Sequence, residues 1–516
     1  MPRLYRAIDT LDNVGDSIKL SRFDGGLNVH DSNEVLKNSE AIVRENWVSD
    51  GMGAIKKVSG HTKTNSTLMG AKPVRMLARV YQSDGTTKLL AMCNGKLFYS
   101  DDDGASFDQE GNSTAYTETD FFTGVDYYNL HFFTGLNQNL HVYTPGTDKS
   151  AAAADTPTDP CRILLKRSDE RMIAFNNDVN GATEYFTKVQ PTNSADDWSA
   201  ANDAGSIAID GAKSGGLVGG ATFGSYDIIF KDYAAFKVWG YPTPQAQRLP
   251  GSPGCAAPYS VAQGDGLCFF LAHDGVYMYD QTQFIKISDP IEEEIDSINS
   301  SYVRNAFGVY RNGFYRLFYT YTGETTNKKT LVYDVARSNP YQKVNVWHKR
   351  TGLLMNCPIV FNGRGDDNEL YAGDSASTGF VYRLDYSSTG ADNTSDIEAS
   401  YQTKYFNGGY PHLVKRYSKV HVRYYLNQGD LLVYWYTKRG NVSGSYTISP
   451  SQTGVALGTF VLGTDYLAGV VEATHTQRLP DTAIGEDISL KFYHKSTGSA
   501  PIIRDVQIDW EGLYTP

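Results

Sequence analysis

The chain has 516 residues and a formal net charge of −11, from 58 acidic and 47 basic residues. That length allows two or more domains, and the negative balance argues against the basic stripe that holds a nucleic-acid backbone. Aromatic residues make up 13% of the chain and glycines number 49, a mixture typical of Tyr-rich strands joined by tight turns, so we expect an all-β fold.

The cysteines and the N-terminus bear on the cellular compartment. The five cysteines are scattered without a C-x-x-C pair, so we expect buried, reduced thiols: Cys93, Cys161, Cys255, Cys268 and Cys357. The first twenty residues lack the hydrophobic core of a signal peptide, and no run reaches ~18 uncharged apolar residues. We therefore expect a protein made in the cytosol, without a membrane-spanning segment.

Residues 1–50 are predicted to form an N-terminal arm with the first strands. It contains the stretch FDGGLN, Phe23 to Asn28, whose paired glycines suit a phosphate cradle, a tight turn or a close backbone approach. A weak helical pattern covers 38–48 (NSEAIVRENWV).

Residues 51–390 are predicted to form a β-propeller of about six or seven blades. An aromatic-rich strand followed by a polar turn recurs seven times between Leu97 and Leu370, or once in about 45 residues, close to the spacing of four-stranded blades. The repeats share no strict consensus, and a chain of sandwiches is the competing interpretation.

One turn in this region is more specific. SDDDGASF, Ser100 to Phe107, resembles the Asp box that closes hairpins in sialidase-type propellers. Asp102 is expected to accept backbone N–H bonds, Gly104 to adopt a positive φ and Phe107 to pack between blades, which is a structural role.

A single convincing helix is predicted near residue 290. In SDPIEEEIDSI, Pro290 suits the first helical position and Ile291, Ile295 and Ile298 fall on one face. Glu292 to Glu294 occupy the first turn, where the helix dipole favours negative charge, so a short surface helix is expected rather than a catalytic cluster.

Residues 397–516 are predicted to form a β-sandwich, after a polar stretch at 386–396. Val420 to Leu426 alternate in polarity, Asn427 to Asp430 make a turn, and the strand Leu431 to Thr437 is apolar or aromatic on both faces. Such a strand is expected to be covered on both sides.

The sequence offers no constellation for catalysis. It has no H-E-x-x-H motif, no G-x-S-x-G elbow, no P-loop and no complete G-x-G-x-x-G, and its paired carboxylates sit among Gly, Ser and Asn in turns. We therefore predict a protein that is not an enzyme, with no catalytic residue, no cofactor-binding residue, no metal ligand and no cofactor.

The segment from Phe23 to Gly60 has an ordered set of glycines and polar residues. The set comprises Phe23, Gly25, Gly26, Leu27, Asn28, Glu40, Asn46, Gly53, Lys57 and Gly60. It resembles the opening of β-propeller proteins of the tail nozzle or tail hub in podovirus-like tailed phages, of the packaged-DNA stabilisation type, with Lys57 where Arg is expected. Three later stretches match in the same order: 171–200 with its Asp-Trp turn, 226–240 and 267–295.

The resemblance implies a structural protein of the virion tail, assembled in the host cytoplasm. It would form a homohexameric ring below the portal and adaptor, retain packaged DNA, serve as conduit for its ejection and dock tail fibres or spikes. DNA would pass through the lumen without sequence-specific binding, and an acidic wall would let it slide. In that setting Gly25 and Gly26 are expected to turn the arm closely against the propeller or a neighbour rather than to bind phosphate.

Two alternatives remain open from the sequence. The Asp box and the many tyrosines suit a glycan-active or glycan-binding, sialidase-like propeller, although a sialidase site needs several arginines converging on a carboxylate. A receptor-binding module at the tail tip would share the location of a nozzle but bind a different partner.

Overall fold

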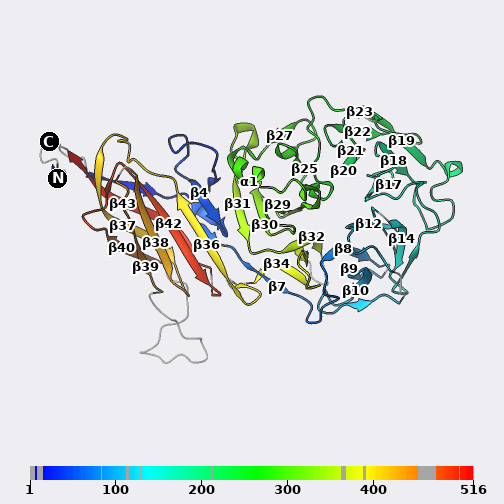
Figure 1. Cartoon of the computed structure of the whole chain (residues 1–516), viewed down its shortest axis with the longest axis horizontal. Coiled ribbons are helices and arrows are strands. Elements are labelled where there is room, and N and C mark those ends of the chain that lie inside the picture. Colours follow the sequence, from blue (N-terminus) through cyan, green and yellow to red (C-terminus); the bar gives the residue numbers. More distant parts are fainter. Residues whose placement is uncertain are drawn as a thin grey trace.

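The computed structural model describes residues 6–7, 15–82, 84–111, 115–127, 129–136, 138–211, 213–361, 368–387, 391–438, 440–450, 472–498 and 500–514. Strands dominate these ranges, and the helices are single turns (Figure 1). The prediction of an all-β chain is confirmed.

Six separate four-stranded antiparallel sheets form blades of a β-propeller. The first two blades consist of β8 (Val74–Tyr81), β9 (Thr87–Cys93), β10 (Lys96–Ser100) and β11 (Asp108–Gln109), and of β12 (Phe122–Tyr127), β13 (Leu130–Gly135), β14 (Gln138–Thr144) and β15 (Lys149–Ala152). The next two consist of β16 (Ile163–Lys166), β17 (Met172–Phe175), β18 (Thr183–Phe186) and β19 (Gly205–Ala208), and of β20 (Leu217–Phe223), β21 (Tyr226–Lys231), β22 (Ala235–Trp239) and β23 (Gln245–Arg248). The last two consist of β24 (Ala262–Gly264), β25 (Leu267–Ala272), β26 (Gly275–Tyr279) and β27 (Phe284–Lys286), and of β32 (Met355–Phe361), β33 (Glu369–Asp374), β34 (Val381–Ser387) and β7 (Gly60–Lys63).

A further four-stranded unit completes the ring between β24 and β32. Its strands are β28 (Phe307–Arg311), β29 (Phe314–Tyr319), β30 (Lys329–Asp334) and β31 (Trp347–Thr351), and β28 contacts both β24 and β32. We call it the junction blade. The sheet of β32, β33, β34 and β7 is the closing blade, because the N-terminal strand β7 pairs with β34 near the end of the propeller. The propeller thus agrees with the six or seven blades predicted from the repeat spacing.

The second region is a sandwich of two long sheets. One contains β40 (Ala473–Arg478), β37 (Val414–Tyr425), β43 (Ile502–Tyr514), β6 (Ile55–Lys57), β5 (Trp47–Ser49), β1 (Arg6–Ala7), β2 (Gly15–Leu20) and β41 (Ile484–Gly485). The other contains β3 (Gly26–Leu27), β4 (Glu40–Glu45), β35 (Ala391–Asp392), β36 (Ser395–Thr403), β42 (Asp487–Ser496), β38 (Leu431–Lys438) and β39 (Ser443–Ile448). Apolar residues of both sheets form one buried core, which is typical of packed sheets.

The two regions share a sheet. β31 of the junction blade pairs with β4, and β4 pairs with β36, so hydrogen-bonded strands run without a break from propeller to sandwich. Figure 1 shows the propeller and the sandwich end to end, with the C-terminal end of β43 at the far end of the sandwich.

The N-terminal segment differs from its prediction in two ways. The helix expected over 38–48 is strand β4 followed by β5, because β-branched Ile42 and Val43 favour a strand and β31 and β36 offer hydrogen-bonding edges on both sides. Within the predicted arm, 1–50, strands β2, β4 and β5 belong to the sandwich; the propeller strands run from Gly60 to Ser387.

The short helices lie in connections between strands. They are η1 (Gly51–Gly53), η2 (Ala200–Asn202), η3 (Pro258–Ser260), η4 (Asp289–Ile291), α1 (Glu292–Asp296), η5 (Val303–Asn305) and η6 (Pro340–Gln342). The helix predicted near residue 290 is confirmed as η4 and α1, with Glu292 to Glu294 in the first turn of α1.

Candidate functional site at the propeller–sandwich junction

The first of the four stretches that carry the resemblance, residues 23–60, lies where the propeller meets the sandwich. Residues 23–60, here called the junction clip, include β3, β4, β5, β6 and the start of β7. They reach both sheets of the sandwich, and β7 closes the propeller. The sequence predicted close packing here, and the structure supplies the partners.

The paired glycines pack against backbone. A Cβ on Gly25 would lie 2.7 Å from the carbonyl carbon of Ser39. Gly26 has a φ of +94°, and a Cβ there would lie 2.9 Å from the backbone N of Trp347 and the Cα of Val346. Both positions therefore exclude a side chain, and the clip lies directly on the junction blade, as the sequence predicted.

Asn46 ties three segments together. Its Nδ2 donates to Thr351 Oγ1 at 2.8 Å and to the Glu398 carbonyl at 2.7 Å, and its Oδ1 accepts from Thr351 N at 3.0 Å and Arg350 Nη1 at 3.1 Å. Thr351 belongs to the junction blade and Glu398 to the sandwich strand β36. Because the donors and the acceptor of this buried amide are all hydrogen-bonded, Asn46 fixes the position of the propeller relative to the sandwich.

Two buried cations lie under the clip. Arg44 has no exposed surface, and its guanidinium donates to the Trp47 carbonyl, the Phe23 carbonyl and Ser49 Oγ. Lys57 is equally buried; its Nζ donates to the Ser496 carbonyl at 2.7 Å, and burial lowers the pKa of its ammonium to about 8. Arg44 was not singled out from sequence, where it is one basic residue in a predicted helix.

The short helix α1 also contacts the clip. Lys349 of the junction blade binds Glu294 Oε1 at 2.8 Å and Glu45 Oε1 at 2.8 Å. These carboxylates raise the pKa of the Lys349 ammonium against the effect of burial. The Glu294 carboxylate in the acidic turn of α1 is thus paired with Lys349, and this ion pair links α1 to the junction blade.

The Asp-box turn has the expected geometry. Asp102 Oδ1 accepts from Ser100 Oγ at 2.7 Å and Ser106 N at 2.9 Å, and its Oδ2 accepts from Ser106 Oγ at 2.6 Å. Gly104 has a φ of +85°, and Phe107 packs against the core shared by the first and closing blades. The residues of the box bond to one another, which supports a structural role.

We expect Asp102→Ala to lower the free energy of unfolding by about 1 kcal/mol, since it removes three hydrogen bonds to an exposed carboxylate. Urea unfolding of the full chain measures the change. Asp108→Ala, at an exposed carboxylate on the following strand, is the control and is expected to stay near zero. Equal effects of the two variants would contradict the assigned role.

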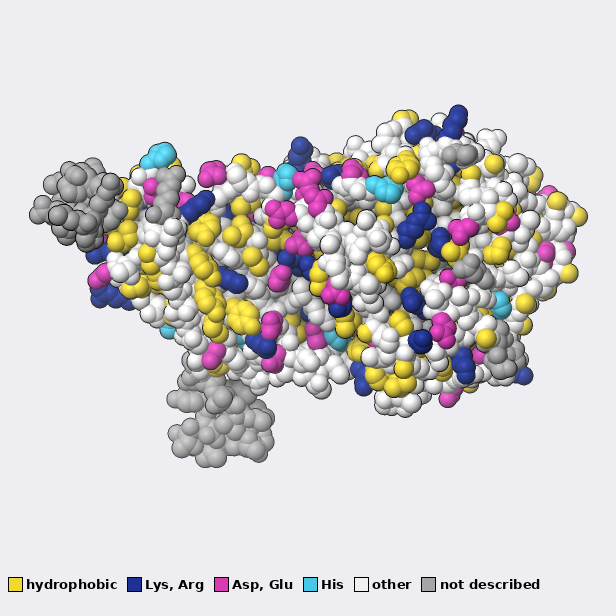
Figure 2. Space-filling view, in the orientation of Figure 1, with side chains coloured by type: hydrophobic (Ala, Val, Ile, Leu, Met, Phe, Trp, Pro, Cys, Tyr) yellow, Lys and Arg dark blue, Asp and Glu magenta, His cyan; other side chains and the backbone are white. Residues whose placement is uncertain are grey.

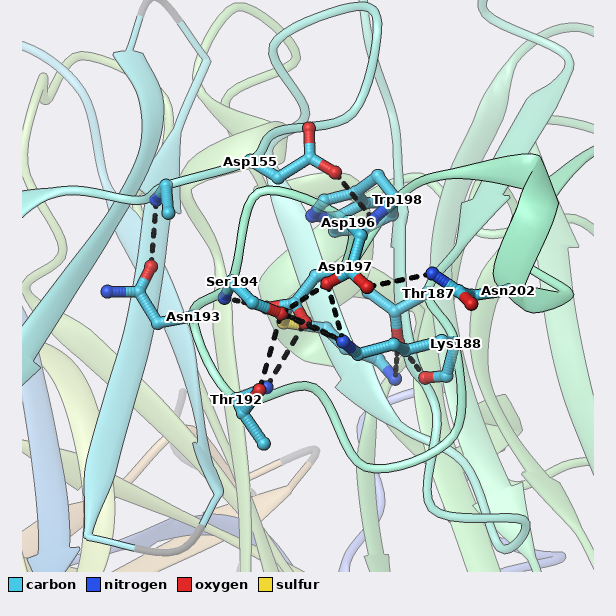
Figure 3. A network of polar contacts seen from close by, with 12 residues as sticks. Asp155, Thr187, Lys188, Thr192, Asn193, Ser194, Asp196, Asp197, Trp198 and Asn202 are labelled. Atoms are coloured by element: carbon cyan, nitrogen blue, oxygen red, sulfur yellow. Dashed lines mark hydrogen bonds and ion pairs between the residues drawn. The ribbon is translucent and has the colours of Figure 1, made fainter.

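The Asp-Trp turn of the 171–200 stretch lies in the loop between β18 and β19, which is held by side-chain hydrogen bonds and ion pairs (Figure 3). Lys188 Nζ binds Asp196 Oδ1 at 2.8 Å and Asp197 Oδ1 at 3.1 Å. Trp198 N donates to Asp155 Oδ2 at 2.7 Å, which fastens the loop to the connection after β15. These contacts hold the loop against the propeller, and they engage the carboxylates of Asp196 and Asp197.

A buried charged cluster lies between the blades of β16–β19 and β20–β23. Arg167 Nε lies 3.0 Å from Asp227 Oδ2, and Asp169 lies within 4 Å of both Arg167 and Arg171. Glu184 is fully buried, neither of its oxygens has a hydrogen-bond partner among the described residues, and burial raises the pKa of its carboxyl to about 8. The sequence analysis did not single out this cluster, because its members come from three separate places: the connection between β16 and β17, strand β18 and strand β21.

The propeller encloses a central cavity of about 390 Å³, lined by the innermost strands. Its wall is mainly apolar, with Asp126 and His131 paired at 2.6 Å. Within the described ranges, no group of three His, Cys, Asp or Glu is placed to hold a metal ion.

The five cysteines are all buried and free, as the sequence predicted. Among the helices that the structure describes, none has the length and apolar character needed to cross a membrane.

Comparisons with known proteins find distant structural likenesses. No family model and no curated protein matches the chain. Among solved structures, YCF48 bound to a D1 peptide is similar with a TM-score of 0.39 and 10% identity, over 64% of this chain and 95% of that one. YCF48 from Cyanidioschyzon merolae is similar with a TM-score of 0.37 and 10% identity, over 63% and 98%. Likenesses this distant carry no argument about function or partner.

Proposed function

We propose that the chain is a structural, non-enzymatic subunit of a phage tail, a wall segment of a homo-oligomeric nozzle or hub ring below the portal and adaptor. The ring would retain packaged DNA, pass it at ejection and dock fibres or spikes. The proposal combines the family resemblance of residues 23–60 with their position at the junction. A continuous sheet and a tightly packed clip make propeller and sandwich one stiff unit, as a ring wall requires.

The observation that carries the proposal is a half-exposed aromatic face of the sandwich, seen among the residues that the structure describes. The sequence predicted that Leu431 to Thr437 is covered on both sides. In β38 the inward residues Leu431, Val433 and Trp435 are buried in the core, but the outward residues are only half-buried. The outward face gathers Tyr405, Leu432, Tyr434, Tyr436 and Tyr493.

This tyrosine face suits contact with another copy of the chain. Tyrosine is enriched in protein interfaces, because it combines a large apolar ring with a polar end. Figure 2 shows hydrophobic side chains in a band over the strands of the sandwich. A neighbouring copy packed there would cover the second side of β38. The apolar pattern of that strand predicts such a cover.

Charge supports a conduit rather than a DNA-binding protein. With a net charge of −11, the chain lacks the positive field that holds a phosphate backbone. A lumen with this balance would repel a duplex weakly and let it slide.

Mass photometry of the purified protein, alone and with its candidate portal–adaptor complex, tests the assembly. We expect a step of about six chains of 57.0 kDa on that complex. The double variant Tyr434→Ser/Tyr493→Ser should lose the step, whereas Tyr233→Ser, at an exposed propeller tyrosine, should retain it. Chains that stay monomeric with the complex at high concentration would refute the proposal.

The glycan hypothesis has less support. In the charged cluster of the propeller, two arginines meet the carboxylates of Asp169 and Asp227, but Arg167 and Arg171 are only 4% and 0% exposed. A sugar would not reach them. Turnover of fluorogenic glycosides would revive that hypothesis, and binding of the isolated protein to host cells would favour a receptor-binding tail-tip module.

A further inference from the structure

A second cavity lies under the junction clip. It has a volume of about 190 Å³ and is bounded by the junction blade, by Leu384 and Asp385 of the closing blade, and by Val48, Ser49, Val58 and Ser59 of the clip. We call it the junction pocket. It is separate from the central cavity, with which it shares no lining residue.

The pocket wall contains hydrogen-bond donors without acceptors. Thr330 is 1% exposed, and its hydroxyl has no partner among the described residues. Arg316 Nη2 binds Asp385 Oδ2 at 2.6 Å, but the buried Nη1 of the same guanidinium has no partner there either. An unpaired buried donor is costly, so these groups call for an acceptor that the described part of the chain does not provide.

The charge around the pocket is positive. Arg316 is paired with Asp385 and Arg350 with Asp392, but Arg44 donates only to two carbonyls and the Ser49 hydroxyl. Burial, together with the three guanidiniums, lowers the pKa of His348 well below its ordinary value, so this imidazole is neutral. Among the residues that line the pocket, Arg316 and Arg350 are cationic and Asp385 is the one carboxylate, while Asp392 pairs with Arg350 from outside this lining.

The rest of the wall is apolar. Phe314, Val332, Leu353 and Leu384 line the pocket beside the donors. A strongly hydrated inorganic dianion would leave these groups uncovered, whereas a monocarboxylate with a short hydrocarbon or aromatic body matches both parts of the wall.

We propose that the junction pocket binds a small organic monocarboxylate. The carboxylate accepts from Arg316 and Thr330 in a charge-assisted geometry, and the apolar body lies between the junction and closing blades under Val58 of the clip. Bound there, the ligand would link the clip to two blades. The proposal is independent of ring formation.

Benzoate and benzamide provide a matched pair of probes, because they share a shape and differ in charge. Isothermal titration of the full chain should show saturable binding of benzoate and at least tenfold weaker binding of benzamide. Saturable binding of both with equal affinity, or no saturable binding of benzoate, would overturn the proposal.

Variants locate the site. Arg316→Gln should weaken benzoate binding by about tenfold or more and Thr330→Val by a smaller factor, since each removes one donor to an anion. Asp385→Asn should strengthen it, because that change removes a competing carboxylate at the pocket while leaving the fold's apolar contacts intact. Arg304→Gln, at an exposed arginine paired with Asp232 outside the pocket, is the control.

Folding of each variant is checked by its thermal unfolding midpoint without ligand. Unchanged benzoate affinity in a folded Arg316→Gln protein, or equal losses in Arg316→Gln and Arg304→Gln, would contradict the assignment. Tighter binding in Asp385→Asn has no explanation from a purely structural role of Arg316 and therefore supports the site directly.

Discussion

Replacement of Gly26 by Ala is expected to lower the free energy of unfolding by about 2–4 kcal/mol, one of the two largest effects foreseen here. Two costs add. An L-residue at a φ of +94° is strained, and its Cβ would lie 2.9 Å from backbone atoms of Val346 and Trp347. Because those atoms belong to the entrance of β31, the clip must lift from the junction blade to make room. Urea unfolding of the full chain measures the loss.

The chain offers a matched control for this variant. Gly323 has a φ of +91°, and a Cβ there would meet nothing within 4 Å. Gly323→Ala therefore carries the backbone strain alone, expected at about 1 kcal/mol. Similar losses in the two variants would mean that the close approach of clip and junction blade contributes nothing to stability.

The second large effect concerns pH. Burial raises the pKa of Glu184 to about 8 in the folded chain, against an ordinary value of 4.5. Between these two values the folded state holds a proton that the unfolded state has lost. The stability contributed by the neutral carboxyl is therefore full below pH 4.5 and falls as pH rises through 8, by about 1.4 kcal/mol per unit within the window.

Glu184→Gln removes this titration while keeping a neutral side chain of the same shape. Relative to the unsubstituted chain, the variant should gain about 2 kcal/mol of stability between pH 6 and pH 8. Taking the difference between the two proteins at each pH cancels the titrating groups that do not interact with Glu184, including Lys57. Chemical unfolding at pH 6, 7 and 8 measures it; Glu398→Gln, at an exposed carboxylate paired with Lys495, should show no such gain. A difference that does not change with pH would contradict a buried, neutral Glu184.

The sequence predicted local features well. The aromatic strands and polar turns between Leu97 and Leu370 are blades and their connections, and the bonds of Asp102 follow from residue types at fixed spacing. The crowding at Gly25 and Gly26 was also readable, because paired glycines in an apolar setting indicate a close backbone approach.

Long-range pairing was not readable. β2 pairs with β43 at the opposite end of the chain, and β4 pairs with β31 on one side and β36 on the other. No local sequence pattern predicts either pairing. For the same reason the segment 38–48 resembled a helix: its apolar spacing was ambiguous, and the neighbouring strand edges decided the outcome.

The candidate sites show the same limit. The junction pocket brings Arg316, Thr330 and Asp385 together from three strands of two blades. Each is an ordinary residue in its own strand, so only the assembled fold reveals the unpaired donors. The outward face of β38 is an intermediate case, because the two-sided apolar pattern was visible in the sequence but the half-exposure of the outward residues was not.

Negative-stain imaging of the protein mixed with its candidate portal–adaptor complex tests the central claim most directly. The account predicts rings of about six copies with an open channel on that complex, with neighbouring sandwiches in contact. Single propeller–sandwich units that ignore the complex would contradict it.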